Sequence, residues 1–176
     1  ITTEALFAYN NLREFVGLAP VTLEEVGEWA QAVEPFESFV GAYVKQPKNP
    51  KGKPELTKAA NVDTALMQMG VSYARLGNTE DAIDRLNMLV THYASAETPH
   101  MPLALSEQGK LLYDTEALKR ARPTLERFVN ERKNKNLKVF QSASANAEVG
   151  RVHYYLGWID AVENRHPEAA ANFQIA

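Results

Sequence analysis

Apolar residues recur every three or four positions along most of this 176-residue chain, which is the spacing of amphipathic helices. The first such run extends from Thr3 to Leu18, where Gly17 and Pro20 end it because neither residue favours a helix interior. The strict alternation of apolar and polar residues that marks a half-buried strand is not convincing anywhere. The pattern therefore predicts an all-α fold.

A second helix is predicted to begin at a capping box. Thr22 and Glu25 have the spacing in which each side chain binds the other residue's backbone N–H, and Val21 and Val26 have the spacing of a hydrophobic staple. Pro35 is expected to kink or split this helix, since proline removes a helical hydrogen bond. The apolar residues of the helix are Trp29, Val33, Phe36, Phe39, Val40 and Tyr43.

Residues 46–54 have the composition of a loop, because they interleave prolines and a glycine with lysines. This loop is the clearest boundary in the chain. We therefore expect an irregular N-terminal helical segment at residues 1–46, a loop and lead-in at residues 47–62, and a helical array at residues 63–176.

After the loop, the same helical hairpin pattern occurs three times. In the first hairpin, apolar residues define a helix that runs to Leu76, Gly77 and Asn78 interrupt it, and a second helix follows. In each hairpin a glycine of the first helix and an alanine of the second are twelve residues apart: Gly70 and Ala82, Gly109 and Ala121, Gly157 and Ala169.

This interval has a physical reason, since two small residues let the antiparallel helices of one hairpin approach closely. Four residues after each alanine stands a large apolar residue, namely Leu86, Leu125 or Phe173. We expect this large residue to fill the space between neighbouring hairpins.

The spacing resembles that of the tetratricopeptide repeat family, whose unit of about 34 residues is a helix-turn-helix with small residues at set positions. The segments that carry the resemblance are Leu66–Gly77 with Ala82–Ile83, and Tyr155–Gly157 with Glu168–Ala169 and Asn172–Phe173. The resemblance implies three units between residues 63 and 176, stacked as a right-handed α-solenoid, with the last hairpin truncated.

The chain departs from the family pattern at several places. Successive glycines are 39 and 48 residues apart, so the connections between units are longer than usual. Pro123 falls within a second helix, and Asp160 stands where the family prefers an aromatic residue.

The connection from Thr91 to Ala96, continuing through Pro99 to Pro102, resembles the repeat subtype of bacterial outer-membrane assembly lipoproteins and of periplasmic partners of the Tol-Pal system. The resemblance implies a bacterial protein outside the cytoplasm. The sequence itself leaves the compartment undetermined, because the chain begins at Ile1 and not at an initiator methionine.

In this family the first helices of the hairpins line a concave groove, and the resemblance implies a scaffold that binds a peptide or protein segment there. Projecting one turn from the core positions gives these groove residues: Gln68, Val71, Arg75, Glu107, Lys110, Tyr113, Asp114, Arg151, Tyr154, Tyr155 and Trp158. Aromatic residues and arginine suit such a surface because they supply contact area and hydrogen bonds at modest entropic cost. Clamping of a chaperone carboxylate is not expected, since Met67 and Val71 stand where that clamp needs Lys and Asn.

Two alternatives stay open. Tyr154 and Trp158 have the spacing of residues that pack beneath a following helix, and in that case they belong to the core. The chain is also a candidate for a structural role, in which its repeats stack on other repeats or on a second copy through the unfinished hairpin that ends at Ala176.

Candidate chemistry is sparse, and we expect neither an enzyme nor a bound cofactor or metal ion. The chain has no cysteine, its four histidines are dispersed, and it has no Gly-rich phosphate loop or nucleophile elbow. No apolar run approaches the roughly 20 residues of a membrane span.

The charges, 19 basic against 22 acidic, do not favour nucleic acid. One basic stretch stands out: Lys119, Arg120, Arg122, Arg127, Arg132, Lys133, Lys135 and Lys138. Glutamates interrupt this stretch, so we interpret it as a solvated helix face and its exit loop and not as a phosphate-binding surface.

Overall fold

The computed structural model describes residues 22–45 and 55–176 and confirms an all-α protein built from a tetratricopeptide-like helical repeat. The predicted helix at Thr3–Leu18, the staple of Val21 on Val26 and the loop at residues 46–54 lie outside the described part. The helices are α2 (Leu23–Gly41), α3 (Val62–Arg75), α4 (Thr79–His92), α5 (Met101–Asp114), α6 (Leu118–Lys133), the 3-10 helix η1 (Lys138–Gln141), α7 (Ala143–Val162) and α8 (His166–Phe173).

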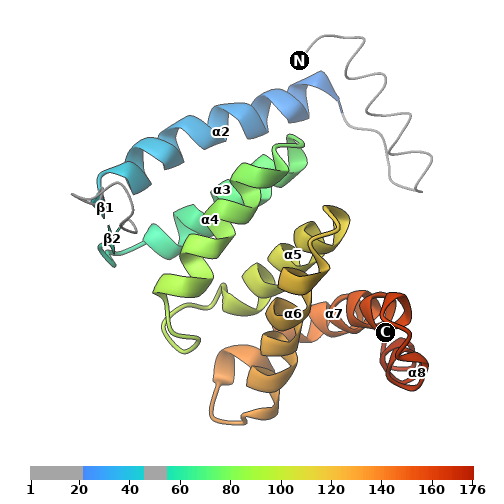
Figure 1. Cartoon of the computed structure of the whole chain (residues 1–176). Helices are drawn as coiled ribbons and strands as arrows, with labels where there is room; N and C mark the ends of the chain where they lie inside the picture. Colours follow the sequence, from blue (N-terminus) through green and yellow to red (C-terminus); the bar gives the residue numbers. More distant parts are fainter. Residues whose placement is uncertain (1–21, 46–54) are drawn as a thin grey trace.

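The helices pair into hairpins that stack one after another. Helices α3 and α4, α5 and α6, and α7 and α8 form successive antiparallel pairs (Figure 1). Each second helix also packs against the first helix of the next pair, so that α4 lies on α5 and α6 lies on α7. Helix α2 packs on α3 in the corresponding way, which places it where a preceding second helix would lie.

Helix α2 begins as the sequence predicts. The backbone N–H of Thr22 donates to Glu25 Oε2 at 2.7 Å, and the backbone N–H of Glu25 donates to Thr22 Oγ1 at 3.2 Å. Of the two expected effects of Pro35, a kink or a split, the split does not occur, because α2 continues through this residue to Gly41. Proline removes only one helical hydrogen bond, and burial of Val40 against the core holds the last turns in place.

A two-stranded ladder follows α2, although no strand is predicted from the sequence. Strands β1 (Val44–Lys45) and β2 (Glu55–Leu56) pair antiparallel and join the two sides of the connection to α3. Two residues are too few to show an alternating pattern, and for this reason the ladder leaves no sequence signal.

The three hairpin turns share one backbone geometry. A residue in the left-handed region follows each helix glycine by seven positions: Gly77 with φ 80°, Glu116 with φ 59° and Asn164 with φ 60°. The next backbone N–H then reaches back to a helix carbonyl, from Asn78 to Tyr73 at 2.9 Å, from Ala117 to Leu112 at 2.8 Å and from Arg165 to Asp160 at 2.8 Å. This is the Schellman arrangement, which satisfies carbonyl groups at the end of a helix.

Inside each hairpin, the large residue of the second helix lies on the glycine of the first. A Cβ atom added to the glycine would be 2.6 Å from Leu86 Cγ at Gly70, 2.3 Å from Leu125 Cδ2 at Gly109, and 2.7 Å from Phe173 Cε1 at Gly157. This contact lies within one hairpin, whereas the sequence led us to expect these residues between neighbouring hairpins. The absent glycine side chain leaves a depression in the first helix of the same hairpin, and the large residue occupies it.

The long connections between hairpins are ordered by side chains that reach across them. Arg127 donates to the carbonyl oxygen of Val90 at 2.7 Å and to Ser95 Oγ at 3.2 Å, which fastens the first connection. In the second connection, Phe140 is fully buried with its ring centroid 5.5 Å from that of Phe128. The extra residues between units thus contribute to the core.

Candidate partner-binding surface

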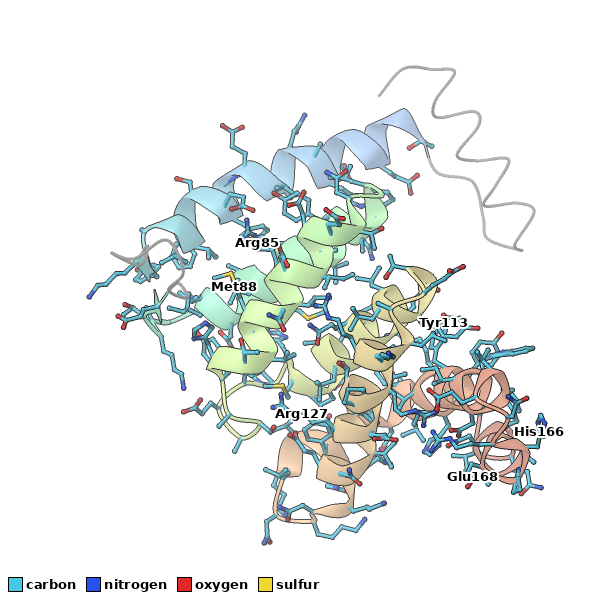
Figure 2. The ribbon with its side chains drawn as sticks, in the orientation of Figure 1. Arg85, Met88, Tyr113, Arg127, His166 and Glu168 are labelled. Carbon is cyan, nitrogen blue, oxygen red and sulfur yellow. The ribbon has the colours of Figure 1, made fainter. Side chains whose placement is uncertain are left out.

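The predicted groove residues of the second and third hairpins come together at the junction of α5 and α7. Arg151 donates to Glu107 Oε1 at 2.7 Å and to Ser106 Oγ at 3.0 Å. The rings of Tyr113 and Tyr155 lie 5.1 Å apart between their centroids, and Figure 2 shows Tyr113 on the side of α5 near α7. These contacts hold the two first helices in a fixed relative position.

An aromatic cluster extends from this junction to the end of the array. We define it as Tyr113, Tyr154, Tyr155, Trp158 and Phe173. The Tyr154 ring centroid lies 5.3 Å from that of Tyr155 and 6.3 Å from that of Trp158, and Trp158 lies 5.6 Å from Phe173. Tyr154 is 46% exposed and Trp158 is 43% exposed, so both rings present apolar surface to solvent.

Sequence reasoning missed Phe173 as a member of this cluster. The residue is 39% exposed, whereas Leu86 and Leu125 at the matching positions of the earlier hairpins are fully buried. One sequence feature distinguishes Phe173: it is aromatic, whereas the equivalent residues of the earlier hairpins, Leu86 and Leu125, are leucines.

Burial and negative charge both act on the pKa values of Tyr113 and Tyr155. Burial, with the carboxylate of Asp114 as the next cause, raises the pKa of Tyr155 to about 12. Burial also raises the pKa of Tyr113, with contributions from Tyr154 and Asp114. The charge of Arg151 acts on Tyr155 in the opposite direction and does not outweigh these effects.

Arg151 is bound on two sides by carboxylates. Burial lowers the pKa of this guanidinium group, but the charges and hydrogen bonds of Glu107 and Glu148 outweigh burial and raise it. Glu148 also accepts a hydrogen bond from Ser106 Oγ at 2.7 Å. Arg151 therefore ties α5 to α7 through charge-assisted hydrogen bonds.

The predicted groove residues of the first hairpin have other surroundings. Gln68 is exposed, while Val71 is half-buried and packs against the hydrophobic core. The guanidinium carbon of Arg75 lies 5.3 Å from the ring centroid of Trp29 in α2, a cation–π contact that the sequence did not predict.

A hollow opens beside the aromatic cluster, where the turn of the second hairpin meets the end of α7. It is lined by Tyr113, Asp114, Glu116, Leu118 and Val162 and has a volume of about 630 Å³. We call it the acidic hollow, because its charged lining residues are both carboxylates. Lys110 lies nearby and binds Asp114 at 2.5 Å in an exposed ion pair.

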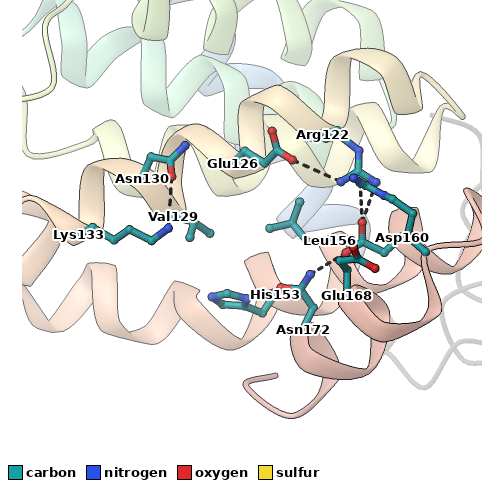
Figure 3. Close-up of a pocket in the computed structure, with 11 residues that line it drawn as sticks. Arg122, Glu126, Val129, Asn130, Lys133, His153, Leu156, Asp160, Glu168 and Asn172 are labelled. Carbon is teal, nitrogen blue, oxygen red and sulfur yellow. Dashed lines mark hydrogen bonds and ion pairs between the residues drawn. The ribbon is translucent and has the colours of Figure 1, made fainter.

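On another side of the array, a polar furrow of about 290 Å³ runs between α6, α7 and α8 (Figure 3). Asp160 is buried there and binds Arg122 at 2.8 Å, Arg165 at 2.6 Å and the side-chain amide of Asn172 at 2.7 Å. These partners explain how a carboxylate occupies a position where the family prefers an aromatic residue, since a buried charge needs close partners.

The equivalent furrow one hairpin earlier, between α4, α5 and α6, has a volume of about 340 Å³. In that furrow Leu112 stands at the position that corresponds to Asp160. The two furrows therefore share their place in the fold and differ in chemistry.

Three arginines of the basic stretch are bound within the molecule. Arg122 binds Asp160, Arg127 binds Glu131 at 2.6 Å, and Arg132 donates to the carbonyl oxygen of Phe140 at 2.7 Å. The cationic surface of this stretch is thus smaller than the sequence suggests.

Among residues 22–45 and 55–176, no group of three His, Asp or Glu side chains has an arrangement that could hold a metal ion. No helix in these residues is long and apolar enough to cross a bilayer. His100 contacts the neutral side chain of Thr64 at 3.0 Å, and His153 contacts that of Asn172 at 2.7 Å.

Comparison with known families agrees with the geometry of the first hairpin. Residues 64–96, which include nearly all of α3 and all of α4, match the family model of the tetratricopeptide repeat. The match covers the first of the three hairpins. The hairpins of α5 with α6 and of α7 with α8 have the same glycine contact and the same turn geometry as the matched hairpin of α3 with α4. No curated protein and no solved structure matches the chain significantly.

Proposed function

We propose that this chain is a non-catalytic scaffold that binds a peptide or a segment of another protein along its first helices. The observation that carries the proposal is the exposure of Tyr154 and Trp158 within the aromatic cluster. Large aromatic side chains at a surface provide apolar contact area together with polar edges, and they dominate many protein interfaces. A tetratricopeptide repeat in the same chain supports a protein as the partner.

The fixed geometry of α5 and α7 favours binding at this place. The contacts of Arg151 with Glu107 and of Tyr113 with Tyr155 are made within the chain, so little ordering is needed when a ligand binds. The proposal assigns no reaction to the surface. An extracytoplasmic bacterial setting is part of the proposal and is supported by the resemblance of the first connection to periplasmic repeats.

The test compares two variants on an array of immobilised synthetic peptides of mixed sequence. We expect the wild-type protein to bind a subset of peptides and the double variant Tyr154→Ala with Trp158→Ala to lose about tenfold or more in affinity. The control is Tyr43→Ala, since Tyr43 is a half-buried tyrosine next to β1, at the other end of the array from α7 and α8 (Figure 1). Thermal unfolding of all three proteins is measured in parallel.

Two results would overturn the proposal. One is equal peptide binding by the wild type and the double variant. The other is unfolding of the double variant at room temperature, because that outcome would make Tyr154 and Trp158 core residues and not groove residues.

A second candidate is a structural role in which the end of the array stacks on another copy. Tyr154 is 46% exposed, whereas the matching residues Met67 and Ser106 are 2% and 0% exposed. Ser106 is covered by α7, with which it makes hydrogen bonds to Glu148 and Arg151. The third hairpin thus exposes a surface that is buried at the preceding junctions.

Light scattering over a wide concentration range separates the two candidates. The structural role requires self-association that increases with concentration and that Phe173→Ser weakens, with no ligand added. A monomer at all concentrations would exclude the structural role and would leave the peptide-binding proposal unaffected.

A further inference from the structure

The charges around the aromatic cluster are unbalanced toward the negative. Four carboxylates lie at the α5–α7 junction and the acidic hollow, namely those of Glu107, Asp114, Glu116 and Glu148. Two basic groups lie among them, those of Lys110 and Arg151. The local formal charge is therefore about −2, while both basic groups already have carboxylate partners.

Two of the carboxylates are accessible to a ligand. Glu116 is exposed in the left-handed turn position and makes no ion pair within the described residues. Asp114 is exposed as well, and its pair with Lys110 is a surface pair between side chains that are 36% and 41% exposed. Such pairs contribute little free energy, so Asp114 can exchange its partner at small cost.

The apolar part of the acidic hollow complements this charge. Tyr113, Leu118 and Val162 supply its apolar lining, and Asp114 and Glu116 are its charged members. A lysine or arginine side chain has a matching structure, because its apolar stem covers apolar surface while its charged head stays near carboxylates and water. A tyrosine face also attracts a cation.

The tyrosine pKa values agree with a negative potential at this place. The carboxylate of Asp114 contributes to the raised pKa of both Tyr113 and Tyr155, after burial as the main cause. The potential therefore extends from the hollow to the Tyr113–Tyr155 contact.

We infer that the segment bound at this surface carries a lysine or arginine side chain that enters the acidic hollow, next to an apolar side chain that packs on Tyr154 and Trp158. The inference rests on the proposed function and gives its partner a chemical class: a basic, apolar polypeptide segment. An acidic segment is disfavoured because Asp114 and Glu116 would repel it.

The test uses sets of three synthetic peptides, and the members of one set are identical except at one position. Each peptide contains a tryptophan or leucine and, at a varied distance from it, arginine, its neutral isostere citrulline, or glutamate. At low salt we expect the arginine peptides to bind about three- to tenfold more tightly than the citrulline peptides, as two exposed ion pairs would provide. The preference should decrease as the salt concentration rises.

Variants of the protein then locate the preference. Asp114→Asn with Glu116→Gln should bring the ratio of arginine to citrulline affinity close to one. Lys110→Gln should increase the ratio, because it removes a competing cation from Asp114. The matched control is Asp84→Asn with Glu168→Gln, which removes two exposed carboxylates outside the hollow and changes the net charge equally.

The outcomes distinguish the two proposals. The proposed function stands if peptides bind and the double variant Tyr154→Ala with Trp158→Ala abolishes this binding. The inference fails in that case if arginine and citrulline peptides bind equally well or if glutamate peptides bind more tightly. An equal loss of the arginine preference in the control variant would also overturn the inference. If no peptide of any charge binds, the proposed function and the inference fail together.

Discussion

Leu125 lies in the depression that Gly109 leaves in α5. A Cβ atom at position 109 would be only 2.3 Å from Leu125 Cδ2 and 2.6 Å from Cγ, distances that real Cβ atoms do not show. Leu125 is fully buried, so its side chain has little free space into which it could move.

Gly109→Ala should therefore destabilise the protein by about 1–3 kcal/mol, although alanine has the higher helix propensity. Urea unfolding measures this change. Adding Leu125→Ala to Gly109→Ala should cost less than the sum of the two single changes, because the small residue removes the clash. The control is Gly27→Ala in α2, where a Cβ atom meets nothing within 4 Å; this change should stabilise by up to about 1 kcal/mol. A neutral Gly109→Ala would contradict the close packing.

Asp160→Ala should be among the most destabilising changes of a polar residue. The Asp160 side chain is 3% exposed and binds Arg122 and Arg165, so its removal leaves two guanidinium groups without their main partner. We expect a loss of about 3–5 kcal/mol in urea unfolding. Asp114→Ala removes an exposed pair with Lys110 and should cost no more than about 0.5 kcal/mol. Equal effects of the two changes would show that burial of the Asp160 pairs is unimportant.

Glu116→Gly should stabilise the second hairpin. Glu116 has φ 59°, in a region that costs a residue with a Cβ atom about 1 kcal/mol and that glycine adopts freely. The expected gain is about 0.5–1 kcal/mol in the free energy of unfolding. The reverse change in the first hairpin, Gly77→Glu, should lose a similar amount, since Gly77 has φ 80°. If Glu116→Gly is destabilising, contacts of the glutamate side chain outweigh backbone strain.

Tyr155 should make the protein less stable in alkaline solution. Its folded pKa is about 12 against 10.0 for an unperturbed tyrosine, so between these pH values the unfolded chain releases a proton that the folded chain retains. Stability from this group is complete below pH 10 and decreases as the pH rises toward 12. Tyr155→Phe removes this contribution, and the decrease in unfolding free energy between pH 9 and pH 11.5 should become smaller by about 1–2 kcal/mol. The same slope in both proteins would contradict the assignment.

The sequence predicted the hairpins because their signals are local. The interval from Gly70 to Ala82 and the break at Gly77 depend on residues within one helix-turn-helix, and the structure places both as expected. The contact of Leu86 with Gly70 was not predicted, since helical spacing shows that a residue is buried but not which helix covers it.

The remaining features depend on residues far apart in the chain. Arg122 and Asp160 are 38 residues apart, so neither position reveals the ion pair in the sequence alone. At the candidate site, Tyr113 and Tyr155 were predicted as groove residues and do meet, whereas Arg75 lies against Trp29 of a helix that the family pattern does not include. The acidic hollow was missed because Glu116 and Val162 come from separate hairpins.

Each glycine and the large residue that covers it belong to the same hairpin, so this close packing contact lies within each unit. The surfaces between units do not take part in this contact. Their residues can differ from one unit to the next, as Leu112 and Asp160 do at equivalent positions of the two furrows. Duplication or deletion of a whole unit would therefore separate no glycine from its covering residue, whereas the contacts of Arg127 and Phe140 across the connections would be changed.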